Sequence, residues 1–182
     1  IPEYYPYIFG PVQAPKIQFT FREVSTGLLF LGFASEKTLT YATLFGEYLQ
    51  YHLLRLGVDL SHTVRQTDNG SEYVGSWNSK HSSSFTLAVE PTEGQRHHTF
   101  PPGRYTYQSD VETVHDIMER EFYELETFQN REDFMDKANS YQLFFNLQRP
   151  NTYKEGKTPW TLSKAKVPAL NKNVALIPPV DL

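Results

Sequence analysis

The amino-acid sequence predicts an α/β domain in which helices cover a mixed β-sheet. Three observations support this fold class: two strand-like segments lie close together near the N-terminus, a long amphipathic segment follows them, and a further strand-like segment precedes more helices. The 182 residues are enough for one domain with a full hydrophobic core, since domains commonly contain about 100–200 residues. The 13 Phe and 12 Tyr residues favour such a packed core over a disordered chain.

The first elements form a predicted hairpin. Residues 17–24 alternate apolar and polar side chains, which is typical of a half-exposed strand, and residues 28–33 are continuously apolar, which indicates a buried one. A long amphipathic helix is expected next, within residues 35–57, with Gly57 as its C-terminal stop. Its apolar face would consist of Ala42, Phe45, Leu49, Leu53 and Leu56.

Two short strands and two helices follow. Residues 62–67 are predicted to form a strand that ends at Asp68, and residues 94–100 form another, before the breaker sequence Pro-Pro-Gly. Residues 80–93 show no clear pattern, and the chain after Asn146 is expected to be loop-like. Between these segments, the apolar faces of the two helices would consist of Val111, Val114, Met118, Phe122 and Leu125, and of Phe134, Ala138, Tyr141 and Phe145.

The composition excludes several classes of function. The chain contains no Cys, so it has neither a disulfide framework, nor a thiolate zinc site, nor a Cys nucleophile. His97 and His98 are adjacent on a predicted strand and would point to opposite faces, which argues against joint metal chelation. The sequence lacks a signal-peptide pattern and any run of about 18 apolar residues, and this predicts a soluble, cytoplasmic protein without membrane contact.

Charge is distributed unevenly along the chain. The net charge of −4 argues against binding nucleic acid through the overall field of the protein. The basic residues nevertheless concentrate toward the C-terminus, where the single acid Glu155 lies among Arg149, Lys154, Lys157, Lys164, Lys166 and Lys172. This segment is either a solvated surface or a local patch for an acidic partner.

Asp68 and Glu112 are the carboxylates with a position suited to chemistry. Asp68 follows a predicted strand, where ligands of α/β sheets often bind, although Asp-Asn-Gly is also ordinary turn chemistry. Glu112 fits a capping box that begins at Ser109. If Glu112 instead points toward Asp68, the pair could hold Mg²⁺. His115, one helical turn later, would then contact a phosphate or support the carboxylate.

Three segments occur in a characteristic order: TDNGSEY at 67–73, HTFPPGRYTYQSDVETVHDIMEREFYE at 98–124, and FFNLQRPNTYKEGKTPW at 144–160. In this order they resemble the catalytic core of retroviral-type integrases and bacterial insertion-sequence transposases. In that family the first segment carries the second catalytic acid, and V-E-x-x-H at a helix start carries the third. An N-x-x-R-P-N segment follows the next helix. The resemblance extends from about Ile17 to Pro168.

This resemblance implies an RNase H-like fold with a mixed five-stranded sheet flanked by helices. Residues 1–148 would form an N-terminally truncated catalytic core, and residues 149–182 a basic, Pro-containing extension. Asp68 would be the second and Glu112 the third acid of a DDE triad that binds two Mg²⁺ or Mn²⁺ ions. Such a site performs phosphodiester hydrolysis and DNA strand transfer, with the ions roughly 4 Å apart. The implied partners are DNA, as element ends and target, and further copies of the chain in a homodimer or higher multimer.

The first acid of the expected triad is absent from the sequence. No Asp precedes Asp59, and neither Glu3 nor Glu23 lies where the family pattern requires an acid. We therefore expect the chain to be a fragment whose first catalytic Asp is encoded shortly before Ile1. We also expect this fragment to bind metal weakly and to lack strand transfer, because a carboxylate site that loses one ligand is less well compensated.

The resemblance also implies DNA contacts, some of them in a flexible active-site loop that follows residue 98. For each single residue an ordinary surface role is an equally open interpretation. Two other functions also stay open: a non-catalytic DNA-binding or assembly module from a decayed transposase, and a structure-selective nuclease with the same fold. The candidate DNA contacts are Arg104, Tyr105, Tyr107, His115, Arg149, Lys154 and Lys157.

Overall fold

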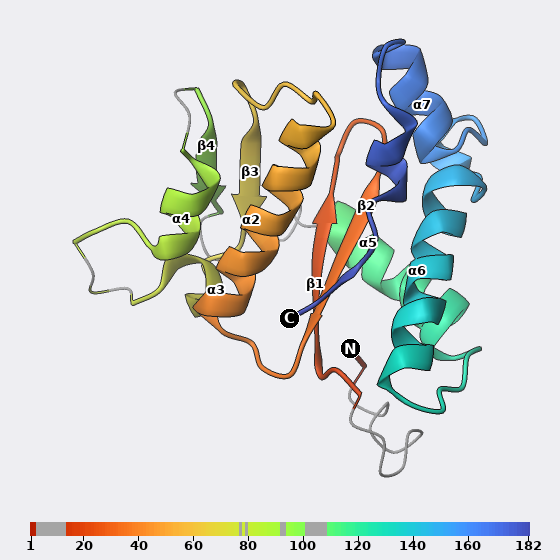
Figure 1. Cartoon of the computed structure of the whole chain (residues 1–182), viewed down its shortest axis with the longest axis horizontal. Helices are drawn as coiled ribbons and strands as arrows, with labels where there is room; N and C mark the ends of the chain where they lie inside the picture. The colour runs from red at the N-terminus through yellow and green to blue at the C-terminus, as the bar shows by residue number, and fades with distance from the viewer. Residues whose placement is uncertain (3–13, 77, 79, 92–93, 101–108) are drawn as a thin grey trace. The chain divides into compact units, whose positions relative to one another are not determined.

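The computed structural model describes residues 1–2, 14–76, 78, 80–91, 94–100 and 109–182 (Figure 1). The chain divides into two compact units. The first unit contains residues 1–35 and 110–181, and the second contains residues 36–109 together with Leu182. Each unit has its own sheet and its own helices.

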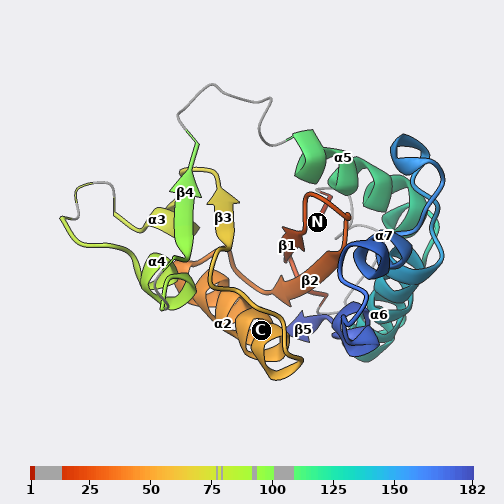
Figure 2. The same cartoon turned by 90° about the horizontal axis from the view of Figure 1, so that it is seen from above.

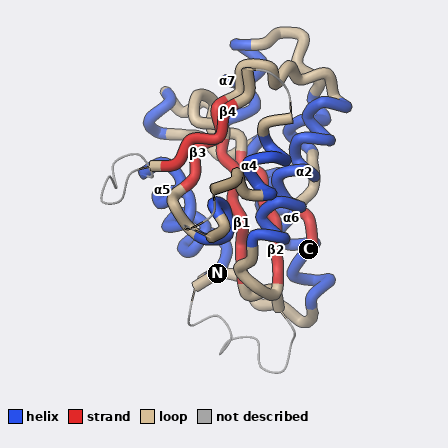
Figure 3. Tube along the Cα trace, turned by 90° about the vertical axis from the view of Figure 1, so that its left-hand side faces the viewer, coloured by secondary structure: helices blue, strands red, loops and turns tan. Residues whose placement is uncertain are grey.

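The first unit is built on the hairpin that the sequence predicts. β1 (Ile17–Arg22) pairs antiparallel with β2 (Leu29–Ala34), and Figure 3 shows the two strands side by side. β2 is buried along its whole length, whereas β1 is mostly half-buried, as their apolar patterns predict. On its other edge β2 pairs in parallel with the short β5 (Val180–Asp181), which makes the sheet mixed.

Two helical segments share the core of this unit with the sheet. α5 (Ser109–Met118) continues into the π-helical turn η2 (Glu119–Tyr123), and α6 (Arg131–Leu147) follows. All the apolar positions predicted for α6 are buried. The shared core cluster includes Leu29, Leu31, Phe33, Val114, Met118, Phe122, Phe134, Ala138, Tyr141 and Phe145.

Leu125 departs from the prediction. Its helical spacing places it on the buried face, but 73% of the residue is exposed. In η2 the N–H of Glu124 bonds to the carbonyl of Glu119, five residues earlier, at 2.9 Å, so this turn is wider than an α-helical one. Residues beyond the turn are therefore rotated off the face that buries Phe122.

Two side-chain amides of α6 join β2 to the C-terminal part of the unit, and we call this pair the amide clamp. Gln142 accepts from the N–H of Leu31 at 2.8 Å and donates to the carbonyl of Ile177 at 2.6 Å. Asn146 accepts from the N–H of Leu29 at 2.8 Å and donates to the carbonyl of the same residue at 2.9 Å. Both amides are fully buried, so their hydrogen bonds replace the partners that water or another strand would supply.

Residues 149–181 belong to the first unit. They form η3 (Thr152–Lys154), α7 (Pro159–Lys166) and η4 (Lys172–Leu176) before β5, and both α7 and η4 contact α6. The expectation of a loop-like chain after Asn146 is therefore wrong for α7, which the Thr158 side chain caps. The compact units do not divide at the predicted boundary between residues 148 and 149.

The second unit contains the other two predicted strands. β3 (Val64–Thr67) pairs in parallel with β4 (Arg96–Thr99), with Thr67 opposite Thr99. Both strands lie within the segments that the sequence predicts, and their carboxyl ends meet at one edge of the sheet.

Three helices accompany β3 and β4 (Figure 2). α2 (Leu39–Arg55) packs on α3 (Ser71–Val74) and on α4 (Ser84–Val89), and α4 also contacts β4. α2 is the long helix that the sequence predicts, and Gly57 follows it with a φ of +78°, as a helix stop requires. α4 lies within residues 80–93, where the sequence shows no clear pattern.

A buried arginine ties β3 to these helices. Arg65 is 6% exposed; its Nη2 donates to the side-chain oxygen of Gln50 on α2 at 2.7 Å, and its Nη1 donates to the carbonyl of Val89 on α4. A buried guanidinium needs such acceptors, because an unpaired buried charge is strongly destabilising. Arg65 thereby holds β3 in place three residues before Asp68.

The α/β class is confirmed, but the single five-stranded RNase H-like sheet is not. The strands of the described residues form a three-stranded mixed sheet in the first unit and a two-stranded parallel sheet in the second. Within these residues β1 pairs as a strand only with β2, and β3 only with β4. The five strands that were expected in one sheet therefore belong to two sheets in the described residues.

Replacing Asn146 by Ala should destabilise the first unit by about 2–4 kcal/mol, because it leaves the buried N–H and carbonyl of Leu29 without partners and each such group costs about 1–3 kcal/mol. Urea denaturation followed by tryptophan fluorescence measures the change. Gln148→Ala, at an exposed position just after α6, is the control and should stay within about 0.5 kcal/mol of wild type. Equal stability of the two variants would contradict the role of the amide clamp.

Candidate functional site

Asp68 stands at the carboxyl end of β3, in a loop that is tied to β4 on both sides of it. Before it, the hydroxyl oxygen of Thr67 lies 2.8 Å from Nε2 of His97. After it, Nδ2 of Asn69 donates to the carbonyl of Phe100. The backbone from which the Asp68 side chain projects is therefore fixed by the neighbouring strand and the residue that follows it.

The carboxylate of Asp68 takes part in the turn and is also open to solvent. Its Oδ1 accepts a hydrogen bond of 2.9 Å from the N–H of Gly70, as expected of Asp-Asn-Gly turn chemistry. The residue is exposed, and within the described residues Oδ2 has no hydrogen-bond or ion-pair partner. The two interpretations of Asp68 are thus compatible: one oxygen closes the turn, and the other can bind a hard cation.

Glu72 is the buried acid of the same loop, and it is already paired. Its carboxylate lies 2.6 Å from Nζ of Lys37, with 5% of the Glu72 side chain exposed. The carboxylate also folds back against Gly70, where an added Cβ would come within 2.5 Å of both oxygens. Burial, together with the charges of Glu72 and Asp68, raises the pKa of Tyr73 well above its ordinary value. These residues hold the loop and are not free for chemistry.

Glu112 lies in the first turn of α5 and is exposed. It belongs to the first unit, whereas Asp68 belongs to the second. Two residues before Glu112, Asp110 pairs with Nε of Arg22 at 2.6 Å, which ties the start of α5 to β1. The predicted capping box depends on the side chain of Ser109, which lies outside the described side chains.

The two-ion site stays a prediction. Among the residues that the structure describes, no group of three or more His, Asp or Glu side chains is arranged to hold a metal ion. Asp68 and Glu112 each supply an exposed carboxylate, which is the oxygen ligand that Mg²⁺ and Mn²⁺ prefer. The residues therefore fit such ions by ligand type, one acid in each unit.

His115 is engaged with the hairpin. Its Nε2 lies 3.0 Å from the hydroxyl oxygen of Thr20 on β1. Although the residue is exposed, nearby protein atoms restrict the hydration of its ring and lower the pKa of His115; the N-terminal ammonium adds to this effect and Asp116 opposes it. The hydrogen bond of His115 to Thr20 supports α5 against β1, and a phosphate contact by His115 stays a prediction.

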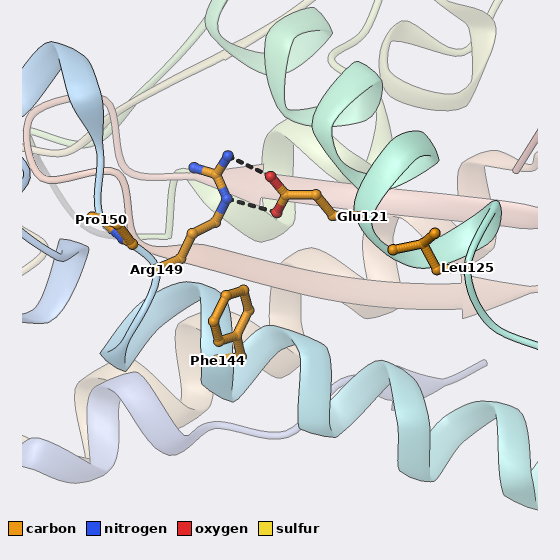
Figure 4. A pocket seen from close by; sticks show the side chains of 5 residues that line it. All are labelled: Glu121, Leu125, Phe144, Arg149 and Pro150. Atoms are coloured by element: carbon orange, nitrogen blue, oxygen red, sulfur yellow. Dashed lines mark hydrogen bonds and ion pairs between the residues drawn. The ribbon is translucent and has the colours of Figure 1, made fainter.

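Arg149 forms a two-pronged ion pair with Glu121. Its Nε lies 2.7 Å from Oε2 and its Nη2 lies 2.6 Å from Oε1. The hydrogen bonds from Arg149 lower the pKa of the Glu121 carboxyl, and burial opposes this effect. The two side chains line a surface pocket of about 420 Å³ (Figure 4). Its lining consists of Glu121, Leu125, Phe144, Arg149 and Pro150.

The two candidate lysines follow an exposed tyrosine. Nζ of Lys154 donates to the carbonyl of Ser25 at 3.0 Å, and Nζ of Lys157 lies 2.6 Å from the carboxylate of Glu155. Tyr153, directly before Lys154, is 92% exposed; the sequence did not predict this, because nothing in the chain pattern separates it from buried tyrosines. The remaining candidates, Arg104, Tyr105 and Tyr107, lie outside the described residues.

Comparison with known proteins identifies a shared fold. A solved structure of the simian T-cell lymphotropic virus intasome in complex with PP2A regulatory subunit B56 gamma contains a similar chain, with a TM-score of 0.59 and 18% sequence identity. The match covers 85% of this chain and 51% of that chain, so the protein spans about half the length of the chain it matches. No protein-family model and no curated protein matches the sequence. The resemblance to integrase cores is therefore supported as a distant likeness of fold.

Within the described part of the chain, no helix combines the length and the apolar character that spanning a membrane requires.

Gly70→Ala should destabilise the second unit by about 1–3 kcal/mol, because the new Cβ displaces the Glu72 carboxylate from Lys37. The penalty should largely disappear in a Glu72→Ala background, where no carboxylate is left to displace. A double-mutant cycle by urea denaturation measures this coupling. Strictly additive effects would show that Gly70 and Glu72 do not restrict each other.

The ion pair of Arg149 and Glu121 should make stability depend on pH with a defined sign. The pKa of Glu121 is held below its ordinary value of 4.5, so the contribution of the pair is present above about pH 4.5 and is lost as the pH falls through the lowered pKa. Arg149→Ala should cost about 1 kcal/mol at neutral pH, since the pair is partly exposed, and less in acid. Urea titrations at pH 7 and pH 3 measure both differences, and an equal difference at the two pH values would contradict the assignment.

Proposed function

We propose that the chain is part of a catalytic core of the integrase or transposase type, which would cut and join DNA phosphodiester bonds by means of two Mg²⁺ or Mn²⁺ ions. Without the first acid of the triad, which this sequence lacks, the chain by itself should not join DNA. The observation that carries the proposal is the loop at residues 67–73. Thr67, Asn69 and Glu72 of this loop are bonded to residues outside it and hold its backbone. Asp68 presents a carboxylate oxygen that is unpaired within the described residues. An anchored acid at the carboxyl end of a parallel strand suits a metal ligand, because such ligands must be held in position.

Two further observations support the proposal. The sequence resembles integrase cores in three ordered segments, and the fold is similar to that of a chain from a viral intasome structure. Sequence order and backbone geometry are different kinds of comparison, and both favour DNA as the substrate. They also favour action as part of a multimer.

Asp68 and Glu112 are the residues that would hold the ions. When bound, the ions would activate a water or a DNA 3′-hydroxyl and stabilise the leaving oxygen. The protein's own contribution is to hold the acids: Asp68 through the anchored loop, and Glu112 through the start of α5, which Asp110 ties to Arg22.

The exposed turn around η3 offers a surface for DNA. Lys154 and Lys157 supply positive charge for phosphates, and Tyr153 adds an aromatic face that can stack on a base or sugar. Asn151 closes this turn, since its side chain accepts from the N–H of Tyr153 at 3.0 Å. Arg149 is already paired with Glu121 and contributes less to such a surface.

Metal binding is the most direct test of this function. Asp68→Asn and Glu112→Gln should each weaken Mn²⁺ binding by at least about 10-fold, because each removes a charged oxygen ligand. Paramagnetic broadening of the amide resonances near residues 68 and 112 reports where the ion binds. Asp59→Asn is a matched control, because Asp59 closes a similar turn with the N–H of Ser61 at 2.9 Å. Unchanged Mn²⁺ binding in both acid variants would overturn the proposal.

The same variants separate this function from its alternatives. DNA affinity should change little in either variant, because exposed acids supply no phosphate contacts. A non-catalytic DNA-binding module would bind DNA without Mn²⁺ at Asp68. A structure-selective nuclease would bind metal but would not join an end-processed donor DNA to a target, whereas an integrase or transposase joins them when the first acid, which this sequence lacks, is also supplied.

A further inference from the structure

His97 on β4 uses both of its ring nitrogens within the second unit. Nε2 lies 2.8 Å from the hydroxyl oxygen of Thr67, and Nδ1 lies 2.8 Å from the hydroxyl oxygen of Thr86 on α4. The ring packs edge-on against Phe85, with 5.0 Å between the ring centroids. The backbone N–H of His97 donates to the carboxylate of Glu90. β3 and α4 therefore hold the imidazole in one orientation at the same time.

The hydrogen bonds determine which ring nitrogen carries the proton. The Thr67 hydroxyl donates its one hydrogen to the carbonyl oxygen of Asp68, at 2.9 Å, so toward His97 it can only accept. Nε2 of His97 is then the donor toward Thr67, and Nδ1 lies 2.8 Å from the hydroxyl oxygen of Thr86, which also contacts the hydroxyl of Ser83 at 3.0 Å. Burial lowers the pKa of His97; Arg65 and His98 add to this effect, and Glu90 opposes it.

The result is a directed chain of hydrogen bonds that ends on the candidate metal ligand. His97 donates to Thr67, and Thr67 donates to the carbonyl of Asp68, while Thr86 contacts the other ring nitrogen of His97. On the far side, Asn69 is anchored to Phe100. The backbone of Asp68 is thus held on one side through Thr67 and on the other through Asn69. The hold through Thr67 depends on His97, which is far from Asp68 in the sequence.

We propose that His97 is a positioning residue for Asp68, which fixes the backbone of that acid through the Thr67 hydroxyl. This inference rests on the proposed function, in which Asp68 binds a metal ion. Outer hydrogen-bonding partners of metal ligands orient the ligand and raise metal affinity. His97 would fill that role through the Thr67 hydroxyl, since its own ring nitrogens bond Thr67 and Thr86.

Two substitutions at position 97 separate the two ring nitrogens. The side-chain nitrogen of Gln reaches the place of Nε2 and can donate to Thr67, whereas that of Asn reaches only the place of Nδ1, which faces Thr86. Thr67→Val removes the hydroxyl that carries the link. His97→Asn and Thr67→Val therefore break the connection to Asp68, and His97→Gln keeps it.

The first measurement is hydrogen exchange at the amide of Gly70, which donates to Oδ1 of Asp68 and needs no metal to be observed. We expect exchange to be roughly 5–10-fold faster in His97→Asn and Thr67→Val, the scale of one lost hydrogen bond. The second measurement is Mn²⁺ affinity, which should fall roughly 10-fold in the same variants. His97→Gln should stay close to wild type in both measurements.

Two control variants separate positioning from a general loss of stability. His98→Asn changes the neighbouring, exposed histidine, whose ring lies beside Phe100 instead of Thr67. Thr86→Val removes the other hydrogen bond of the His97 ring and leaves the one to Thr67. Both controls should keep wild-type exchange at Gly70, even where urea denaturation shows that Thr86→Val is less stable.

The outcomes of these measurements are distinct. Wild-type exchange at Gly70 in both His97→Asn and Thr67→Val would overturn the inference. An equal loss in His97→Gln and His97→Asn would also overturn it, because His97 would then be a structural residue only. If Asp68→Asn and Glu112→Gln both bind Mn²⁺ as well as wild type does, the proposed function fails, and the Gly70 measurement still decides whether His97 positions Asp68.

Discussion

The amide clamp of Gln142 and Asn146 is the interaction on which the first unit depends. Along Leu29–Leu31 the edge of β2 meets two side-chain amides where a sheet would ordinarily continue into another strand. An amide side chain carries both a donor and an acceptor, so it can substitute for strand backbone. The same two amides bond the carbonyls of Ala175 and Ile177, which brings the chain to the point where β5 extends the same edge. α6 is therefore both a cover and a lateral neighbour of the sheet.

The segments that resemble integrase cores are used largely for folding. In the segment at 144–160, Asn146 belongs to the clamp, Arg149 pairs with Glu121, and Thr158 caps α7. In the segment at 67–73, most side chains anchor the loop and one carboxylate oxygen is left without a partner in the described residues. A motif of this kind specifies a scaffold, and its chemistry is confined to the few groups that the scaffold leaves accessible. This explains why the local turn interpretation and the metal interpretation of Asp68 do not compete.

Periodicity predicts those parts of the structure that burial decides. The hairpin, α2 and the buried face of α6 follow from apolar spacing, because an amphipathic element has one favourable way to face a core. Leu125 is mispredicted because the π-helical turn before it changes the helical phase. α7 is missed because it is short and is capped by Thr158 from the preceding loop. In the site, the strand end at Asp68 is predictable. The partners of Arg149 and His97 are not, because Glu121 and Thr67 are brought to them only by tertiary packing.

The π-helical turn after α5 has a consequence for aligning this chain with others. A turn whose hydrogen bond spans five residues takes up one residue more than a regular α-helical turn at the end of the same helix would. A related protein with an uninterrupted helix at this place would have no counterpart for that residue. A sequence alignment that is in register at Glu112 would then be shifted by one residue at Arg149, unless a single-residue gap is placed between these two positions. Comparison of backbones in space does not suffer this offset, because it follows the path of the chain and not the count of its residues.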